Sequence, residues 1–264
     1  MIEYALLDID DNEYELSGAG VIEPAKSSIT FLKERFSFDS KITENSFLPG
    51  AVQLGKTRLK SSILSLQLTR SHSTSAAFET AENELIEWLE KTIYLVDLTN
   101  DRRIKVNLKN MDINYDRGGH KLSSENTIQF NLLSPYWENN TQTQVGPDAL
   151  IIDINDVNLN NQGSLNVYPE ITLTAAVAVT QIEMYIDETK HGMRINDALF
   201  GTDIYLTMII DCEQGTILIG ELDRSASILS GTGYFYIPIG AHVLKVTPSA
   251  ICNITVKWRQ RAYI

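Results

Sequence analysis

Cys252-Asn-Ile-Thr-Val-Lys-Trp-Arg259 alternates apolar and polar residues without interruption. Successive side chains of a β-strand point to opposite faces, so this period of two predicts a strand with one face on a core and the other in solvent. The same alternation recurs along the chain, at residues 64–68, 104–108, 128–132, 182–186 and 204–210. Turn residues such as Asn100-Asp101 and Gln214-Gly215 separate many of these runs. The pattern predicts an all-β protein of half-buried antiparallel strands.

Residues 75–92 depart from this pattern. They are rich in helix formers, and five apolar residues fall at helical spacing on one face: Phe78, Ala81, Leu85, Trp88 and Leu89. Ser73, Thr74 and Ser75 are N-cap candidates. We therefore expect one amphipathic helix, about residues 75–92, that packs on a sheet.

Two further segments suggest the domain organisation. Residues 139–163 are dense in Asn, Gln, Asp and Gly, which is typical of a connection because such residues bury little surface. We expect a β-sandwich or barrel-like domain at residues 1–145, an Asn-rich connection at 146–163 and a compact β-sandwich or jelly roll at 164–264. Residues 29–53 contain Phe31, Phe36, Phe38 and Phe47 but no compact pattern, and are predicted to form a projecting arm.

Composition excludes several classes of function. The net charge is −12, from 34 acidic and 22 basic residues, whereas a tight nucleic-acid binder needs clustered Lys and Arg. No apolar run approaches the roughly 18–20 residues needed to cross a bilayer. Residues 1–8 lack a basic start followed by an apolar stretch, so we expect no secretory signal and production in the cytoplasm. Cys212 and Cys252 are therefore expected to be reduced and buried.

Gly50-Ala-Val-Gln-Leu-Gly-Lys-Thr57 fits the phosphate-binding loop pattern in full. In an NTPase, the backbone would hold phosphates, Lys56 would reach the outer ones and Thr57 would bind magnesium. That loop needs a buried strand before it and a helix opening at its end. Here Pro49 and a polar stretch precede it and a strand-like run follows, so we interpret the match as coincidental.

Other candidate sites are weaker still. Asp8, Asp10 and Asn12 resemble the start of a calcium loop, but Glu13 stands where glycine is required and Ala19 where a bidentate Glu is needed. The four histidines have no paired metal-ligand spacing: His72, His120, His191 and His242. No Gly-x-Ser-x-Gly motif marks a hydrolase. We expect no catalytic, cofactor-binding or metal-binding residues.

The order of several short motifs carries a family resemblance. Phe47-Leu-Pro-Gly50 leads to a strand, a helix ending in Leu85-Ile-Glu-Trp-Leu89, and then Tyr94-Leu-Val-Asp97. The segment Asn126–Trp137 closes the first half with Phe-Asn-Leu-Leu-Ser-Pro-Tyr-Trp. The second half has these matching segments: Val167-Tyr-Pro-Glu-Ile171, Gly240-Ala-His-Val-Leu244 and Thr255–Arg261. This order resembles the distal tail protein (Dit) family of siphophages over nearly the whole chain.

The resemblance implies a structural role. Members form a hexameric ring at the tip of the tail tube, with a ring-forming N-terminal domain and a galectin-like C-terminal domain. It implies a homo-hexamer that contacts the tail tube protein, the tail hub or tail-associated protein and a receptor-binding protein, with DNA passing through the ring. The chain would then reside in the virion after assembly in the bacterial host cytoplasm. A closed ring also fits a β protein with unpaired edges, since neighbouring copies can complete them.

Two alternatives remain open from the sequence. The C-terminal sandwich is a candidate carbohydrate-binding module, with Tyr205, Tyr234 and Tyr236 as aromatic contacts. The chain is a less favoured candidate NTPase through residues 50–57.

If acidic residues line a ring, DNA would be repelled from its wall and pass freely.

Overall fold

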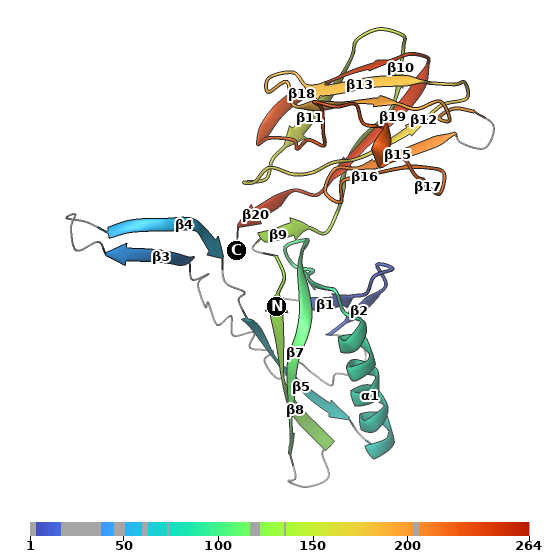
Figure 1. Cartoon of the computed structure of the whole chain (residues 1–264). Helices are drawn as coiled ribbons and strands as arrows, with labels where there is room; N and C mark the ends of the chain where they lie inside the picture. Colours follow the sequence, from blue (N-terminus) through green and yellow to red (C-terminus); the bar gives the residue numbers. More distant parts are fainter. Residues whose placement is uncertain are drawn as a thin grey trace. The chain divides into compact units, whose positions relative to one another are not determined.

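The computed structural model describes residues 4–16, 38–44, 51–59, 63–72, 74–116, 122–134, 136–202 and 206–263. The chain divides into two compact units, residues 1–137 together with residue 264, and residues 138–263. Among the described residues, strands and a single α-helix make up the regular structure, apart from one short 3₁₀ helix, which confirms the predicted all-β class (Figure 1). No helix in these ranges is long and apolar enough to cross a bilayer.

The first unit is an antiparallel sheet backed by the helix. Its elements are β1 (Tyr4–Leu7), β2 (Glu13–Glu15), β3 (Phe38–Glu44), β4 (Ala51–Leu59), β5 (Ile63–His72), α1 (Ser75–Lys91), β6 (Tyr94–Asp97), β7 (Arg102–Asp116) and β8 (Leu122–Leu132). β9 (Tyr136–Asn139) spans the division between the units. The main strands are hydrogen-bonded in the order β2-β1-β6-β7-β8-β5, and β3 pairs with β4 in a separate hairpin.

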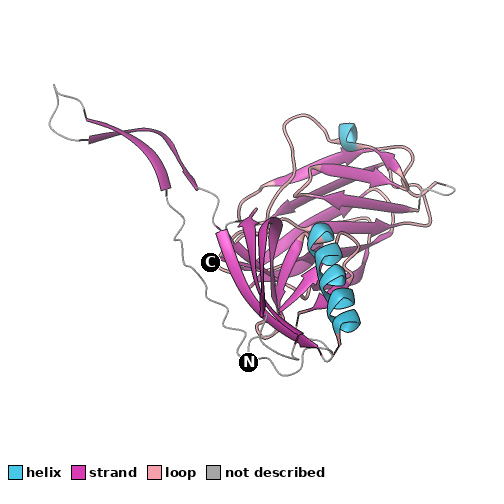
Figure 2. Cartoon of the chain, turned by 90° about the horizontal axis from the view of Figure 1, so that it is seen from below, coloured by secondary structure: helices cyan, strands magenta, loops and turns pink. Residues whose placement is uncertain are grey.

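The helix forms where the sequence predicts it. Thr74 is the N-cap, and its side chain accepts a hydrogen bond from the Ala77 amide at 3.2 Å. Phe78, Leu85 and Leu89 are buried, and Leu85 and Leu89 join a core with Leu6, Ile104, Ile128 and Phe130. Figure 2 shows α1 lying along one face of the strands.

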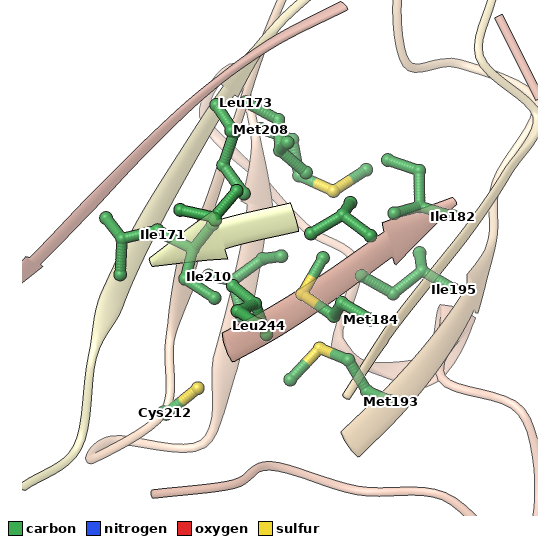
Figure 3. Packing of buried hydrophobic residues seen from close by; sticks show 14 of the residues in the cluster. Ile171, Leu173, Ile182, Met184, Met193, Ile195, Met208, Ile210, Cys212 and Leu244 are labelled. Atoms are coloured by element: carbon green, nitrogen blue, oxygen red, sulfur yellow. The ribbon is translucent and has the colours of Figure 1, made fainter. Parts of the chain in front are cut away.

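The second unit is a sandwich of two antiparallel sheets. Its elements are β10 (Thr143–Leu150), β11 (Asn155–Asn161), β12 (Glu170–Thr174), β13 (Gln181–Ile186), β14 (Gly192–Asn196), β15 (Thr207–Asp211), β16 (Thr216–Ile219), β17 (Leu222–Asp223), the 3₁₀ helix η1 (Ser225–Ser227), β18 (Gly240–Pro248), β19 (Cys252–Trp258) and β20 (Arg261–Tyr263). One sheet has the order β10-β19-β12-β15-β16-β17 and the other β11-β18-β13-β14. Apolar side chains from both fill the space between them (Figure 3).

The Asn-rich segment is not a connection. The division falls between Trp137 and Glu138, and residues 146–163, predicted to link the domains, instead carry most of β10 and all of β11. In β11, Val157, Leu159 and Asn161 are buried while Asn158 and Asn160 are exposed. The asparagines thus mostly occupy the solvent face of a half-buried strand, and their abundance hid the period of two.

The predicted arm lies largely outside the described residues. Of residues 29–53, the structure describes 38–44 and 51–53, which belong to the β3–β4 hairpin. The register of that hairpin pairs Phe38 with Leu59 and Glu44 with Ala51. Whether neighbouring copies complete this segment stays a prediction.

Candidate assembly site

The first candidate site is the outer side of β5, the side away from β8. Its ten residues pair with β8 from Ile63↔Asn131 to His72↔Leu122, and β8 pairs in turn with β7. Within the described ranges β8 is the sole strand partner of β5. An edge strand presents backbone donors and acceptors along its outer side, which makes it a template for a strand of another chain.

A buried polar cluster fixes the helix behind this edge. The Glu82 carboxylate, on α1, accepts hydrogen bonds from Ser124 Oγ at 2.9 Å and from Asn126 Nδ2 at 3.1 and 3.2 Å. Arg70, on β5, donates from Nη1 to the Ala81 carbonyl at 2.7 Å and from Nη2 to the Tyr14 hydroxyl at 2.9 Å. Buried polar groups need such partners, so these bonds specify how α1 sits on β5 and β8.

This cluster was not predicted from the sequence. Glu82 follows Phe78 by four residues and precedes Leu85 by three, so it lies within the apolar face of α1. Its position on the helical wheel was the available signal. A charged residue within such a face indicates a buried partner, but the sequence does not say which strand supplies it.

The phosphate-loop match does not form a phosphate site. Gly50 lies outside the described residues, whereas Ala51–Thr57 belongs to β4, which continues as a strand to Leu59. A phosphate-binding loop requires a helix to open at the Lys-Thr pair. Lys56 and Thr57 lie instead on β4, which forms an antiparallel hairpin with β3. This agrees with the interpretation that the motif match is coincidental.

The calcium-like segment is a hydrogen-bonded turn between β1 and β2. The Asp8 carboxylate accepts hydrogen bonds from the amides of Asp10 and Asn12, each at 2.9 Å, and from Asn12 Nδ2 at 2.9 Å. The Asn12 side chain is the main cause of the lowered pKa of Asp8. No cluster of three or more His, Cys, Asp or Glu suited to a metal occurs within the described ranges.

The predicted histidines and cysteines do not gather. His120 and the side chain of His72 lie outside the described residues. The ring of His191 packs edge-on against Tyr236 at 6.0 Å, whereas His242 lies 3.1 Å from a Glu188 oxygen. Cys212 and Cys252 are buried free thiols, and burial raises the pKa of Cys212 to about 12 and that of Cys252 to about 11. Thiols held protonated in this way are poor nucleophiles.

The aromatic residues proposed for carbohydrate binding separate into three cases. Tyr205 lies outside the described residues. Tyr234 is half-buried and packs against the sandwich core. Tyr236 contacts Tyr168 edge-on, with 6.3 Å between ring centroids, and Tyr168 is exposed. Of the three tyrosines, Tyr236 therefore lies in an accessible aromatic cluster, together with Tyr168 and His191.

A shallow groove also crosses the second unit. It is lined by residues of β13, β14 and the loop at 230–232, among them Tyr185, Lys190 and Arg194. Arg194 Nη2 lies 2.7 Å from Glu183 Oε1, and the Lys190 ammonium lies over the Tyr185 ring at 5.2 Å. Lys190 also forms an ion pair with Asp187 at 2.5 Å. These paired charges give the groove no excess of either sign.

Three comparisons relate the chain to known proteins. Residues 162–261 match the family described as siphovirus-type tail component, C-terminal domain. A crystal structure of the SPP1 Dit (gp 19.1) protein, described as a paradigm of the hub adsorption apparatus in phages infecting Gram-positive bacteria, is similar over 98% of both chains, with a TM-score of 0.67 and 10% identity. No curated protein sequence matches the chain.

The phage P2 baseplate gives a second likeness. Two structures of it in the activated conformation, one with calcium and one with strontium, each cover 97% of this chain and 98% of theirs. Both have a TM-score of 0.54, with identities of 8% and 9%. At such low identities these likenesses concern the fold, and they span both units of the chain.

Proposed function

We propose that this chain, whose residues 162–261 match the siphovirus-type tail component family, is a non-enzymatic structural protein of a phage tail tip or baseplate. The likeness to SPP1 Dit over nearly the full length of both chains supports this role. Three observations fit a protein that catalyses no reaction: the histidines are scattered, the thiols are held protonated, and residues 51–57 form a strand. Its place would then be the virion, after assembly in the host cytoplasm.

The edge of β5 carries the proposal of self-assembly. A ten-residue edge strand that stayed open would risk uncontrolled pairing, which natural β proteins avoid. A heterologous contact between identical copies closes into a ring when its rotation divides a full turn. We therefore assign to β5 a contact with the next copy; the family resemblance suggests six copies.

The ring would act as an adaptor. Its partners would be the tail tube protein on one side, the tail hub or tail-associated protein on the other, and a receptor-binding protein at the periphery. DNA would pass through the opening without specific binding. A ring of six would carry six times the −12 charge of one chain, which opposes adhesion of DNA if acidic side chains line the opening.

The mass of the purified chain tests the assembly. Light scattering should give a multiple of 29.6 kDa, and negative-stain images should show a central hole. A wild-type chain that is monomeric at high concentration would contradict the ring.

A second candidate function is recognition of a carbohydrate by the C-terminal unit. The accessible cluster of Tyr168, Tyr236 and His191 favours it, because aromatic rings stack on the apolar faces of sugars. Glycan-array binding by the full chain, lost in Tyr236→Ala and retained in the half-buried control Tyr234→Phe, would support this function. If the wild-type chain binds no glycan on the array, this second function is excluded.

A further inference from the structure

Exposed apolar side chains gather at one end of the second unit. Ile151, Ile152, Ile154, Val177 and Ile251 are between 53% and 66% exposed. They come from the β10–β11, β12–β13 and β18–β19 loops. We call these five residues the apolar end. Single exposed apolar residues are ordinary on protein surfaces, but a contiguous group marks an interaction surface.

Strand register brings the three loops together. The pair Leu150↔Cys252 ends the ladder between β10 and β19, so Ile151 and Ile251 follow on adjacent strands. The pair Thr174↔Asn253 ends the ladder between β12 and β19 at the same edge of the sandwich. Ser249 then ties the second loop to the third, since its Oγ accepts from the Gln181 amide at 3.1 Å and lies 3.4 Å from Thr180 Oγ1.

Hydrogen bonds fix the β10–β11 loop in a conformation that leaves its isoleucine side chains exposed to solvent. The Asn155 side chain accepts a hydrogen bond from the Ile151 amide at 3.0 Å and donates to the carbonyls of Ile151 and Asp153 at 2.9 and 2.7 Å. It also donates to the Val246 carbonyl on β18 at 3.2 Å. The conformation is therefore fixed without burying the isoleucine side chains. A preorganised apolar surface loses little entropy when a partner covers it.

Charge around the apolar end selects the kind of partner. Residues 148–154, 174–181 and 247–252 contain no Lys or Arg, whereas Asp148 and Asp153 are both present and exposed. Lys245 on β18 is paired with Asp156 at 2.7 Å. An acidic border repels anionic lipid and nucleic acid, and it also repels the same surface of a second copy. It attracts a surface that carries basic residues.

We propose that the apolar end docks a different protein of the same tail, one with an apolar recess bordered by Lys or Arg. This inference rests on the proposed structural role and adds the surface through which the C-terminal unit acts. The isoleucines would fill the recess, and Asp148 and Asp153 would face its basic border.

Particles that contain the chain provide the test. Ile151→Ser with Ile152→Ser, and separately Ile251→Ser from another loop, are compared with Leu229→Ser, an exposed leucine outside the apolar end. Quantitative mass spectrometry of purified particles should show wild-type amounts of the chain and on the order of tenfold less of one other tail protein in the first two variants. The control should match wild type. Unchanged composition in both apolar-end variants overturns the inference.

A charge-reversal variant and tests for two other binding partners, a membrane and a second copy of the chain, complete the experiment. Asp148→Lys should reduce retention of the same tail protein, because it places a like charge against a basic border. Binding of the wild-type chain to phosphatidylcholine vesicles, with or without phosphatidylserine, would overturn the inference in favour of a membrane. A fall in the mass of the purified chain in Ile151→Ser with Ile152→Ser would overturn it in favour of self-association. Absence of the wild-type chain from particles would instead refute the proposed function.

Discussion

Arg261 Nη2 lies 2.6 Å from each carboxylate oxygen of Glu213, so the last strand of the second unit is tied to the β15–β16 turn. The Nε of the same guanidinium donates to Glu138 Oε1 at 2.9 Å, and its carbon lies 6.0 Å from the centroid of the Tyr168 ring. Arg261 is buried, and its carbonyl accepts a hydrogen bond from the Ser164 amide at 2.9 Å. One side chain thus joins the segments by which the chain enters and leaves the sandwich.

Removal of this guanidinium should destabilise the second unit. Arg261→Met leaves two carboxylates without their cation, and we expect a loss of about 3–5 kcal/mol in the free energy of unfolding. Arg261→Lys keeps the charge but not the planar fork, so its loss should be smaller. Urea denaturation followed by Trp fluorescence measures both. Equal stability of Arg261→Met and wild type would show that the ion pairs contribute nothing.

The buried carboxylate of α1 gives a prediction for the first unit. Glu82→Ala leaves Ser124 and Asn126 without an acceptor, and we expect the free energy of unfolding to fall by about 2–3 kcal/mol. Glu84→Ala is the control, because Glu84 is exposed on the same helix and should change stability by less than about 0.5 kcal/mol. Thermal melting compares them. If the two variants melt together, Glu82 does not anchor the helix.

Close backbone contact makes Gly192 irreplaceable in β14. A Cβ atom there would lie 2.0 Å from the Met184 carbonyl oxygen and 2.5 Å from Tyr185 Cα, so β13 and β14 would have to separate. Gly192→Ala should cost about 1–3 kcal/mol, as overpacking does. At Gly233 nothing lies within 4 Å of the added atom, so Gly233→Ala should leave stability unchanged or slightly higher. Chemical denaturation separates these outcomes.

Asp197 should make stability depend on pH. Burial acts to raise the pKa of this carboxyl, but hydrogen bonds from Ser227, the Leu199 amide and Arg224 outweigh it and hold the pKa below its ordinary value of 3.8. Because the pKa is lower in the folded state than in the unfolded state, ionised Asp197 stabilises the fold at every pH above the ordinary value of 3.8. This stabilisation is lost as the pH falls through the folded-state pKa.

The matching variant is Asp197→Asn. At neutral pH the free energy of unfolding of this variant should be about 2 kcal/mol lower than that of wild type, because charged hydrogen bonds are replaced by neutral ones. Below the ordinary value of 3.8 the difference should shrink, because Asp197 of the unfolded wild-type chain binds a proton there and the folded chain binds one only at lower pH. A difference that stays constant from neutral pH to pH 3 would contradict the role assigned to this carboxylate.

Local periodicity accounts for the parts of the fold that the sequence predicted well. The alternation in residues 252–258 forms β19, and helical spacing from Phe78 to Leu89 forms α1 with Thr74 as its cap. Both patterns follow from the geometry of a single element. The Asn-rich segment misled because composition and periodicity disagreed there: Val157 and Leu159 face the core, and Asn158 and Asn160 face solvent.

The sequence by itself determined the class of fold: half-buried strands and one amphipathic helix. Tertiary structure alone decided which distant residues meet. Glu82 and Asn126 are 44 positions apart, yet they meet where α1 packs on β8. Ile151 and Ile251 are separated by a hundred positions, yet the register of β10 with β19 places them on adjacent strands. The physical reason is that a side chain's direction follows from its own backbone, whereas its neighbours follow from how strands pair across the whole sheet.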